Sequence, residues 1–382
     1  NVQILSSNLV SNGDFSQEGV QEVSNGSFSQ EGSELVTNGD FATDSDWILN
    51  NTWFITEGEL TSTSPNLGGS AYQNYNGLVV GNYYRVEFTI SNADSGSVFF
   101  RVGNDYGTAR NDEGTYVEFI QYTSTASQRL GVRTDDNFTG SIDNVSVKEV
   151  GQDWSLTSSG DSSSNVIIDN GSCQIISDGT LTGLTQTLVT TIGKTYKCTI
   201  NISSVNNVGG GIAISNGNVF ASSIATFTTA EIHTFYFKAT STSVSIKRAS
   251  GLGGSIDYTI DNISVKEVGQ DWTTTPTGVT FSEGFANFTS GQDTFVIQTF
   301  LTIGKKYKIS VDYNVTSISD GYFGTNGVAS YATLAGLTGI GTLTANITAE
   351  ATSLIFRSST FNGSITNISV IEITDDTNLP RI

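Results

Sequence analysis

The chain of 382 residues is long enough for two or three domains, each with its own hydrophobic core. Hydrophobic residues make up 37% and charged residues only 14% of the chain, so that Ser, Thr, Asn and Gly cover much of the surface. This composition favours β-sandwiches and argues against intrinsic disorder. A net charge of -20 repels phosphate backbones and anionic headgroups, and no apolar run could span a bilayer. We therefore expect no nucleic acid and no membrane insertion, whereas a glycan or another protein stays open as a partner.

The first 34 residues contain a short repeat. Three heptapeptides recur at intervals of 13 residues, Leu9–Phe15, Glu22–Phe28 and Leu35–Phe41, and only the third is followed by a domain. Residues 1–34 are therefore either a duplicated opening strand left as a flexible tail, or a docking segment that adds strands to a partner or a sister chain. In the second case the partners would be other proteins of the same assembly.

A longer repeat organises the rest of the chain. The tetrapeptide Gly-Gln-Asp-Trp occurs at 151–154 and 269–272, each time directly after a nearly identical ending at 142–150 and 260–268, and a degraded third ending closes the series at 365–373. Internal repeats of this length indicate separate structural units. The sequence therefore predicts three domains at 35–150, 151–268 and 269–374, joined without a spacer into a stiff, nearly linear array.

Each unit contains a strand of strict alternation that opens with Gly-x-x-Tyr. In the first unit the apolar positions are Tyr84, Val86, Phe88 and Ile90, and the other two units repeat the pattern from Tyr196 and from Tyr307. A period of two with one apolar face indicates a half-buried strand, and no segment has a helical period. The predicted fold class is all-β, a tandem array of three β-sandwiches.

The middle unit holds the only cysteines and the only histidine. Alternation places Cys198 on the core side of its strand, and alignment of the repeats places Cys173 there too, so the two are either buried free thiols or a disulfide. His233 lies in an ordinary strand run, and any Ser-His-Asp triad would have to be built around it. Two cysteines and one histidine lack the spacing that a zinc site requires. Nothing singles out one carboxylate pair among 37 acidic residues. We expect the protein not to be an enzyme.

The two ends of the chain suggest a processed or partial product. The sequence contains no Met and opens without a basic and apolar leader. Residues 375–382, ending in Thr-Asn-Leu-Pro-Arg-Ile, indicate an exit segment that leads to a further region.

Three motifs in a fixed order resemble a known family. A Val-[Ser/Thr]-Asn-Gly-Asp-Phe opening with Trp47 soon after, a central Gly-x-x-Tyr strand and an Ile-Asp-Asn-[Val/Ile]-Ser-Val final strand resemble the galactose-binding-like, carbohydrate-binding-module jelly rolls. The resemblance covers residues 35–374 and implies jelly-roll domains. In tandem and with the Thr-Asn-Leu-Pro-Arg-Ile tail, the modules resemble those of tail-fibre and head-appendage proteins of bacteriophages that infect Bacteroidetes. Repeats two and three depart from the family because they open with Gly-Gln-Asp-Trp.

Calcium is the cofactor that the resemblance implies. Asp143 shares the parity of Val145 and Val147, so its carboxylate should point towards the core side and needs a partner. Asp261 repeats this arrangement in the second unit. In the family such an Asp often meets the opening loop around a calcium ion, which would nominate Asn38, Asp40, Asp143 and Asp261 as ligands. The alternative is a carboxylate that caps backbone N–H groups.

Aromatic side chains in loop-like stretches are the candidates for glycan contact, because a ring face packs on the apolar face of a sugar. The candidates are Trp53, Tyr72 and Tyr75 in the first unit and Tyr322 and Tyr331 in the third. Trp47, Trp154 and Trp272 recur at the start of each unit, and we expect them in the cores.

Together these expectations describe a structural appendage or fibre protein on the surface of a virus particle, with carbohydrate-binding-like domains that project outward and contact host surface polysaccharide. Two alternatives stay open, a bacterial cell-surface adhesin and an accessory glycan-binding region of a larger polysaccharide-degrading enzyme. Fibres and spikes are commonly symmetric, so we expect a homo-oligomer.

Overall fold

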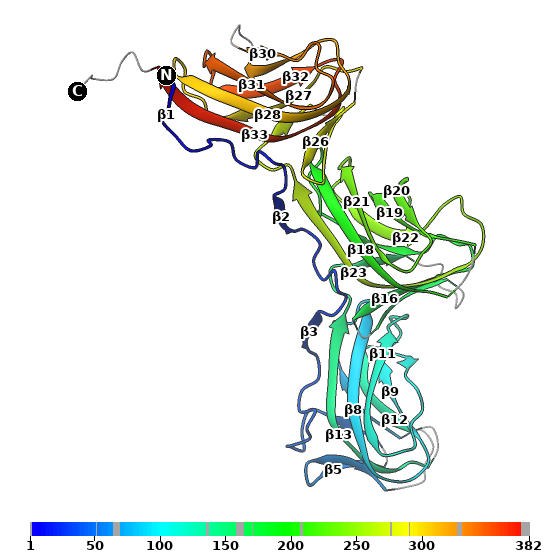
Figure 1. Ribbon diagram of the computed structural model, residues 1–382. Helices are drawn as coiled ribbons and strands as arrows, with labels where there is room; N and C mark the ends of the chain where they lie inside the picture. The colour runs from blue at the N-terminus through cyan, green and yellow to red at the C-terminus, as the bar shows by residue number, and fades with distance from the viewer. Residues whose placement is uncertain are drawn as a thin grey trace.

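The computed structural model describes residues 2–50, 52–63, 69–134, 137–157, 164–169, 171–206, 209–275, 277–289, 291–326 and 331–375. These residues form six antiparallel sheets, three of six strands and three of five, and no helix. None of the described segments is therefore a helix that could cross a membrane. The sheets pair face to face around three hydrophobic clusters, and Figure 1 shows the resulting sandwiches one after another along a bent row. The all-β fold class is confirmed.

The first sandwich contains one large and one small sheet. Its small sheet runs in the order β10-β9-β12-β7-β4, from strands β4 (Ile48–Leu49), β7 (Ser70–Asn74), β9 (Val98–Val102), β10 (Asp105–Tyr106) and β12 (Arg129–Thr134). Its large sheet runs β11-β8-β13-β6-β5 with β3 beside β13, from β3 (Glu31–Glu34), β5 (Trp53–Thr56), β6 (Glu59–Ser62), β8 (Tyr83–Ser95), β11 (Gly114–Gln121) and β13 (Thr139–Val150).

The second sandwich repeats this plan. Its large sheet runs β15-β16-β23-β18-β21 with β2 beside β23, from β2 (Glu18–Gln21), β15 (Asn165–Asp169), β16 (Ser172–Ser177), β18 (Thr195–Val205), β21 (Ile232–Lys238) and β23 (Ile256–Val268). Its small sheet runs β14-β17-β22-β19-β20, from β14 (Ser155–Thr157), β17 (Gly183–Gln186), β19 (Ile212–Asn216), β20 (Ser223–Phe227) and β22 (Val244–Arg248).

The third sandwich has the same two sheets. Its large sheet runs β25-β26-β33-β28-β31 with β1 beside β33, from β1 (Val2–Ile4), β25 (Val279–Ser282), β26 (Phe285–Phe288), β28 (Lys306–Ser317), β31 (Gly339–Thr348) and β33 (Asn362–Asp375). Its small sheet runs β24-β27-β32-β29-β30, from β24 (Thr273–Thr274), β27 (Thr294–Thr299), β29 (Tyr322–Thr325), β30 (Tyr331–Thr333) and β32 (Ser353–Ser358).

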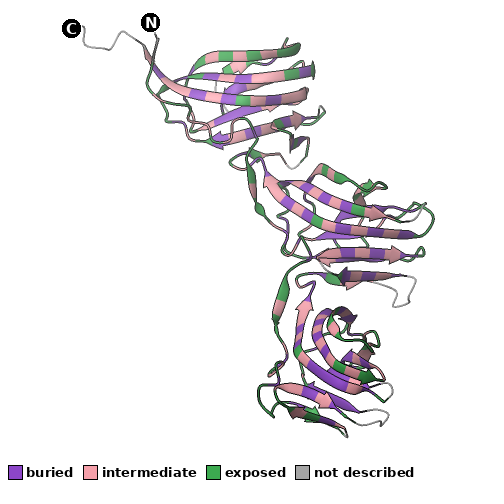
Figure 2. Ribbon diagram, turned by 60° about the horizontal axis from the view of Figure 1, so that its bottom comes forward, coloured by how far each residue is buried: buried purple, intermediate pink, exposed green. Residues whose placement is uncertain are grey.

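The strand order in each sandwich is that of a jelly roll. In the first, the consecutive strands β6 to β13 form the rows β6-β13-β8-β11 and β7-β12-β9-β10, which is the two-sheet pairing of a double Greek key. The other two sandwiches repeat these rows. Alternation drives the assembly, because Tyr84, Val86, Phe88 and Ile90 on β8 are all buried and the residues between them are not. Buried and partly exposed bands alternate along the long strands in Figure 2.

The N-terminal segment, residues 2–34, here called the strap, runs back along the array on the side of the large sheets (Figure 1). The segment β1 pairs with β33 of the third sandwich, β2 with β23 of the second and β3 with β13 of the first. The chain thus begins beside its own last described strand, since Val2 lies opposite Asp375. The expectation of a flexible tail is wrong for this structure, because the strap adds strands to the sheets of its own chain. Addition of strands to a partner or a sister chain stays a prediction.

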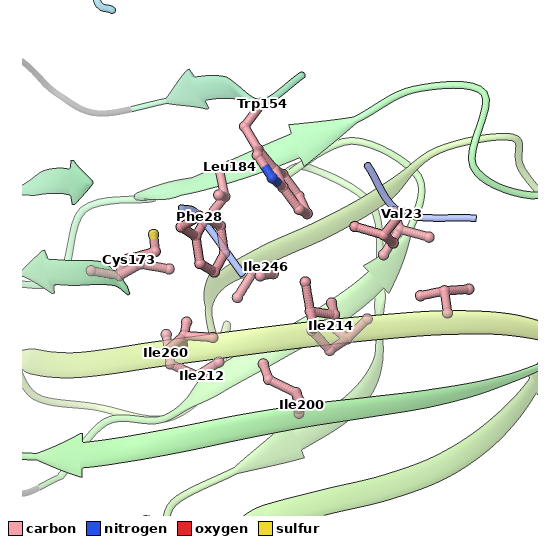
Figure 3. Packing of buried hydrophobic residues seen from close by; sticks show 14 of the residues in the cluster. Val23, Phe28, Trp154, Cys173, Leu184, Ile200, Ile212, Ile214, Ile246 and Ile260 are labelled. Carbon is pink, nitrogen blue, oxygen red and sulfur yellow. The ribbon is translucent and has the colours of Figure 1, made fainter. Parts of the chain in front are cut away.

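The borrowed residues explain why repeats two and three lack the Asn-Gly-Asp-Phe opening. Val23 and Phe28 of the strap are buried in the core of the second sandwich, and Figure 3 shows Phe28 beside Trp154 and Leu184. Phe15 is buried in the third core in the same way. The first sandwich needs no borrowed residue, because the corresponding Phe41 lies in the chain just before the strands whose core it enters. The three Trp predicted for the cores, Trp47, Trp154 and Trp272, are indeed buried there.

The junctions between sandwiches are packed. Tyr83 and Val150 of the first sandwich belong to the hydrophobic cluster of the second, and the Tyr83 hydroxyl donates to the Val166 carbonyl at 2.6 Å. At the next junction Val268 enters the third cluster, and Lys238 Nζ donates to the Thr275 carbonyl at 2.6 Å. Each sandwich is thus tied to the next by buried side chains as well as by the strap.

Candidate functional site

The outward face of the small sheet in the first sandwich gathers arginine and aromatic side chains. Strand pairing places Arg101 on β9 opposite Tyr106 on β10 and opposite Gly131 on β12, while Gly131 lies opposite Tyr72 on β7. Residues opposite each other in an antiparallel pair share a face. Two further side chains, Phe99 and Arg133, lie opposite each other in the adjoining row. Phe99 and Tyr106 form an edge-to-face pair with ring centroids 5.0 Å apart.

The arginines on this face are held by the aromatic rings. The guanidinium of Arg129 lies 4.3 Å from the Tyr72 ring centroid, and that of Arg133 lies 5.9 Å from the Tyr106 ring while it donates to the Tyr106 hydroxyl at 3.1 Å. Among the described residues neither arginine forms an ion pair with a carboxylate. Arg101 is buried and donates to the Gly103 carbonyl from Nε at 2.8 Å, and burial lowers its pKa. Within the described part of the chain, Arg129 and Arg133 therefore place positive charge on this face without a carboxylate partner, although the net charge of the whole chain is -20.

A cleft adjoins this face. Tyr106, which is 43% exposed, is also one of the lining residues of a cleft of about 840 Å³ at the junction with the second sandwich. Arg110 and Glu118 line it too and form an ion pair at 2.7 Å. Across the cleft lies Asp169 of β15, whose pKa is raised by burial. The cleft is polar and open, so Tyr106 could contact a ligand that extends from the sheet face into it.

The third sandwich presents a smaller version of the same face. Tyr322 and Tyr331 lie with ring centroids 5.3 Å apart, and Arg357 lies opposite Tyr322 on the neighbouring strand. Strand order makes these three residues the counterparts of Phe99, Tyr106 and Arg133. Here Asp293 forms an ion pair with the arginine, which lowers the pKa of the carboxyl and raises that of the guanidinium. The third face therefore lacks the free positive charge of the first.

The second sandwich keeps a cation but lacks the aromatic pair. Lys247 takes the place of Arg133, is buried, and donates its ammonium to the Ala221 carbonyl. Ala213 and Ser223 occupy the two aromatic positions. The two positions that hold rings in the first sandwich therefore hold none in the second.

The structure changes the interpretation of the five predicted glycan residues. The expectation that they lie in loops is wrong for four of them, because Trp53, Tyr72, Tyr322 and Tyr331 lie in strands β5, β7, β29 and β30. Trp53 is only 4% exposed and its ring stacks on Phe138 in the core, so it presents no face to a ligand. Tyr75 follows β7 and packs against the same core. Tyr72, Tyr322 and Tyr331 do lie on the two outward faces.

Sequence reasoning missed the arginines and the Phe99–Tyr106 pair. A signal was present, because four of the few positive charges of the chain, Arg101, Arg110, Arg129 and Arg133, fall within one short stretch.

Each predicted calcium ligand has a hydrogen-bond partner within the protein. Asn144 has a positive φ of 54° and the register shifts between Asp143 and Ser146, so the parity argument for an inward Asp143 is wrong. Its carboxylate instead accepts from the Asn144 backbone N–H at 2.7 Å. The side-chain amide of Asn38 donates hydrogen bonds to the carbonyls of Thr43 and Ser45. The exposed Asp40 accepts weakly from the backbone of Ala42 at 3.4 Å, and Asp261, which also sits at a register shift, accepts from Ser203 at 2.6 Å. No group of three or more His, Cys, Asp or Glu suited to a metal occurs among the described residues.

The cysteines are free and the histidine is structural. Cys173 on β16 and Cys198 on β18 lie on opposite sides of β23 and form no disulfide. Two strand spacings, together about 9–10 Å, separate their backbones, which is more than a disulfide can bridge. Burial raises the pKa of both thiols. His233 stacks on Phe227 with centroids 4.3 Å apart, and its Nε2 contacts the Thr229 carbonyl.

No protein-family model and no curated protein matches the chain. Among solved structures it is similar to the N-terminal CBM22-1-CBM22-2 tandem domain of Xyn10C from Paenibacillus barcinonensis, at 11% identity over 63% of this chain and 99% of that one, with a TM-score of 0.24. It is also similar to the triple jelly roll fold of an archaeal virus turret assembly, at 15% identity over 86% and 89% of the two chains, with a TM-score of 0.22. At such TM-scores these likenesses carry no argument, and the jelly-roll assignment rests on the strand order of this chain.

Proposed function

We propose that this protein is a non-enzymatic structural arm of an exposed assembly, a virion appendage, and that its first sandwich contacts a carboxylated surface glycan. The observation that carries the glycan part is the face with Tyr106, Phe99, Arg129 and Arg133. The rings supply apolar planes for sugar faces. The two guanidinium groups, which form no ion pair with any described carboxylate, suit the carboxylates of a ligand, which guanidinium groups bind through paired hydrogen bonds.

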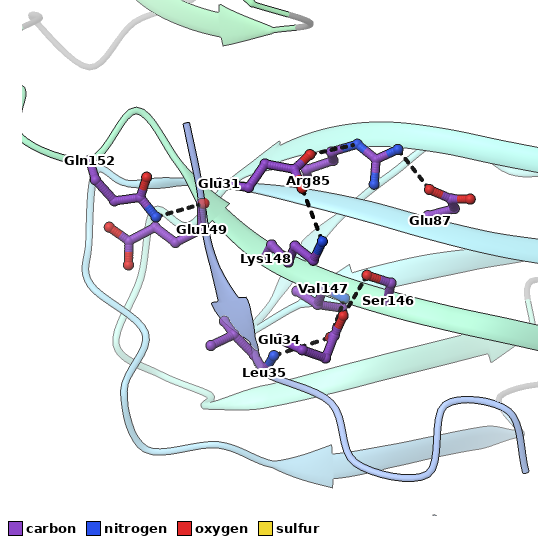
Figure 4. A network of polar contacts seen from close by, with 10 residues as sticks. All are labelled: Glu31, Glu34, Leu35, Arg85, Glu87, Ser146, Val147, Lys148, Glu149 and Gln152. Atoms are coloured by element: carbon purple, nitrogen blue, oxygen red, sulfur yellow. Dashed lines mark hydrogen bonds and ion pairs between the residues drawn. The ribbon is translucent and has the colours of Figure 1, made fainter. Parts of the chain in front are cut away.

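The arm part is supported by the way the sandwiches are joined. Buried side chains cross both junctions, and the strap spans all three sandwiches on one side. Glu31 of the strap binds Arg85 at 3.3 Å and Lys148 at 3.0 Å on the first sandwich, and Figure 4 shows this contact beside that of Glu34. A rigid array of this kind holds a terminal binding face at a fixed distance from its anchor.

A glycan array tests the binding part. The full chain should bind polysaccharides that contain uronic or sialic acids more tightly than their neutral counterparts, and the binding should weaken as salt is raised, because exposed charges are screened. Binding that is insensitive to salt, or a preference for neutral glycans, would contradict the role of the arginines. An array without any bound glycan would leave the three sandwiches as spacers.

Antibody labelling of the native source tests the location. With negative-stain imaging, we expect label on virus particles at their projections. Label on the cell envelope and none on particles would overturn the virion assignment in favour of a cell-surface adhesin.

Calcium binding by Asn38, Asp40, Asp143 and Asp261 stays a prediction. Calorimetric titration with calcium chloride should show heat if it is right, and chelation should lower the melting temperature. Neither effect is expected if the carboxylates only satisfy backbone and side-chain donors, as the hydrogen bonds of Asp143 and Asp261 suggest.

A further inference from the structure

The second and third sandwiches each bind a peptide of the strap, a part of the chain distant in sequence, in the way that a protein binds a peptide ligand. Phe28 is 1% exposed and its ring centroid lies 5.6 Å from that of Trp154, while Phe15 is 2% exposed and lies 5.4 Å from Trp272. The indole Nε1 of Trp154 donates to the Asn25 carbonyl at 3.1 Å, and that of Trp272 to the Asn12 carbonyl at 3.0 Å. In each case one Trp both packs on the aromatic ring and fixes the backbone before it.

A buried glutamine reads the backbone of the peptide at each site. Gln186 accepts from the Ser24 N–H at 2.8 Å and donates to the Ser24 carbonyl at 2.9 Å. Gln298 does the same for Ser11, at 3.0 Å in both directions. Both glutamines are at most 9% exposed. This two-way pairing imitates a strand partner and requires an extended backbone at that position.

The glycine of the peptide is required by close approach. A Cβ placed on Gly26 would lie 2.2 Å from the Ile263 carbonyl oxygen, and one on Gly13 would lie 2.2 Å from that of Ile368. The same glycines accept from the N–H groups of Ile263 and Ile368 at 2.9 Å. Any larger residue must push two backbones apart, so the sites select glycine.

Residues that precede the motif in the strap add further contacts, including strand pairing. The Gln21 side chain accepts from the Val265 N–H at 2.8 Å, and Asn8, 13 residues earlier, accepts from the Val370 N–H at 2.9 Å. The segments β2 and β1 then pair with the parts of β23 and β33 that β16 and β26 leave unpaired. Both sites thus recognise the same elements in the same order, a polar acceptor, Val, Ser, Asn-Gly and Phe.

We propose that the second and third sandwiches each carry a binding site for this peptide motif, and that the strap of a second copy of the chain can fill both sites. Only the motif of the first sandwich is continuous with its domain, whereas the other two sites meet residues more than a hundred positions away in sequence. Every copy of the chain carries the same strap residues, so the sites cannot distinguish their own strap from that of a neighbour. Exchange of straps would join copies without a new interface.

A cleavable strap tests recognition in the full chain. A specific protease site is inserted between Ser29 and Gln30, both of which are exposed, and the folded protein is cut there. The fragment of residues 1–29 should stay bound on gel filtration. A fluorescent synthetic peptide of the same residues should then replace it, either directly or on refolding from denaturant. A peptide with Gly13→Ala and Gly26→Ala should bind at least ~100-fold more weakly. Uptake of both peptides alike, or of neither under any condition, would overturn the proposed sites.

Co-refolding tests the second copy as the source. Two full-length chains with different affinity tags are refolded together at high concentration, and each tag is used to capture the other. We expect mixed dimers that disappear in the Gly13→Ala and Gly26→Ala double variant. If the tags never co-purify while the peptide still exchanges, the sites exist but strap exchange between copies is wrong. Mixed species that survive the double substitution would show association through another surface and would equally contradict strap exchange.

Discussion

The first and second sandwiches have one framework and different faces. Both enclose a motif phenylalanine, a tryptophan and a buried glutamine in matching positions, although the first obtains the motif from the adjoining residues and the second from the strap. On the outward face of the small sheet, the first has Tyr106 and Phe99 where the second has Ser223 and Ala213. The framework residues hold the fold and must be supplied from somewhere, whereas the face residues are free to differ. A shared fold in these repeats therefore does not imply shared binding.

The largest expected effect concerns the borrowed framework. Phe28→Ala should destabilise the second sandwich by about 3–5 kcal/mol, because it empties a fully buried ring site next to Trp154. Amide hydrogen exchange should show the loss in β23 and β18, while the first sandwich keeps its protection. Phe220→Ala, at a residue that is 77% exposed, is the matched control and should change little. If the second sandwich kept its protection without the Phe28 ring, the strap would not stabilise it. The second sandwich would then not depend on its motif phenylalanine as the first is expected to.

A backbone prediction comes next. Gly26→Ala should cost about 1–3 kcal/mol, since the added methyl collides with the Ile263 carbonyl. Gly39→Ala should have the same effect on the first sandwich, where the corresponding distance to the Val145 carbonyl is 2.0 Å. Urea denaturation followed by near-ultraviolet circular dichroism measures both. Gly253→Ala is the control, because a Cβ there meets nothing within 4 Å. Equal stability of the Gly26 and Gly253 variants would mean that the strap can lie elsewhere.

The sequence predicted the framework well and the strap poorly, for a physical reason. Alternation along a strand is local, so the buried residues of β8 and the core tryptophans could be read directly. The contact between Phe28 and Trp154 is not local, and no period within either segment reveals it. A hint existed, because two extra motif copies precede two repeats that lack the motif. The face depends on side chains of three strands, β9, β10 and β12, which only the pairing of the sheet brings together, so no local pattern reveals it. The expected inward direction of Asp143 fails because a positive φ at Asn144 breaks the period.

The binding face gives the third prediction. Tyr106→Ala should weaken binding of an acidic glycan at least about tenfold, which corresponds to about 1.4 kcal/mol, because it removes both a sugar platform and the ring that holds Arg133. Ser223→Ala changes the corresponding position of the second sandwich and should leave binding unaltered. Isothermal titration on both variants decides the matter. An equal loss of glycan affinity in both variants would mean that neither face is the binding site. A loss in the Ser223→Ala variant alone would place the binding site on the second sandwich instead of the first.

The smallest effect concerns the charged part of the strap that crosses the second sandwich. Glu18 binds Lys197 at 2.6 Å and Lys266 at 3.1 Å, and the hydrogen bond from Lys197, with a further contribution from Lys266, lowers the pKa of the Glu18 carboxyl. A carboxyl whose pKa is lower in the folded state stabilises fully above its unfolded pKa of about 4 and loses this contribution as the pH falls through the folded value. The carboxylate is about a third exposed, so the contribution should stay below ~1 kcal/mol. Glu18→Gln should therefore lower the melting temperature slightly at pH 7 and not at pH 3. Glu22→Gln is the control, since the Glu22 carboxylate has no ion pair among the described residues, and an equal shift in both variants would show that net charge rather than the strap contact is responsible.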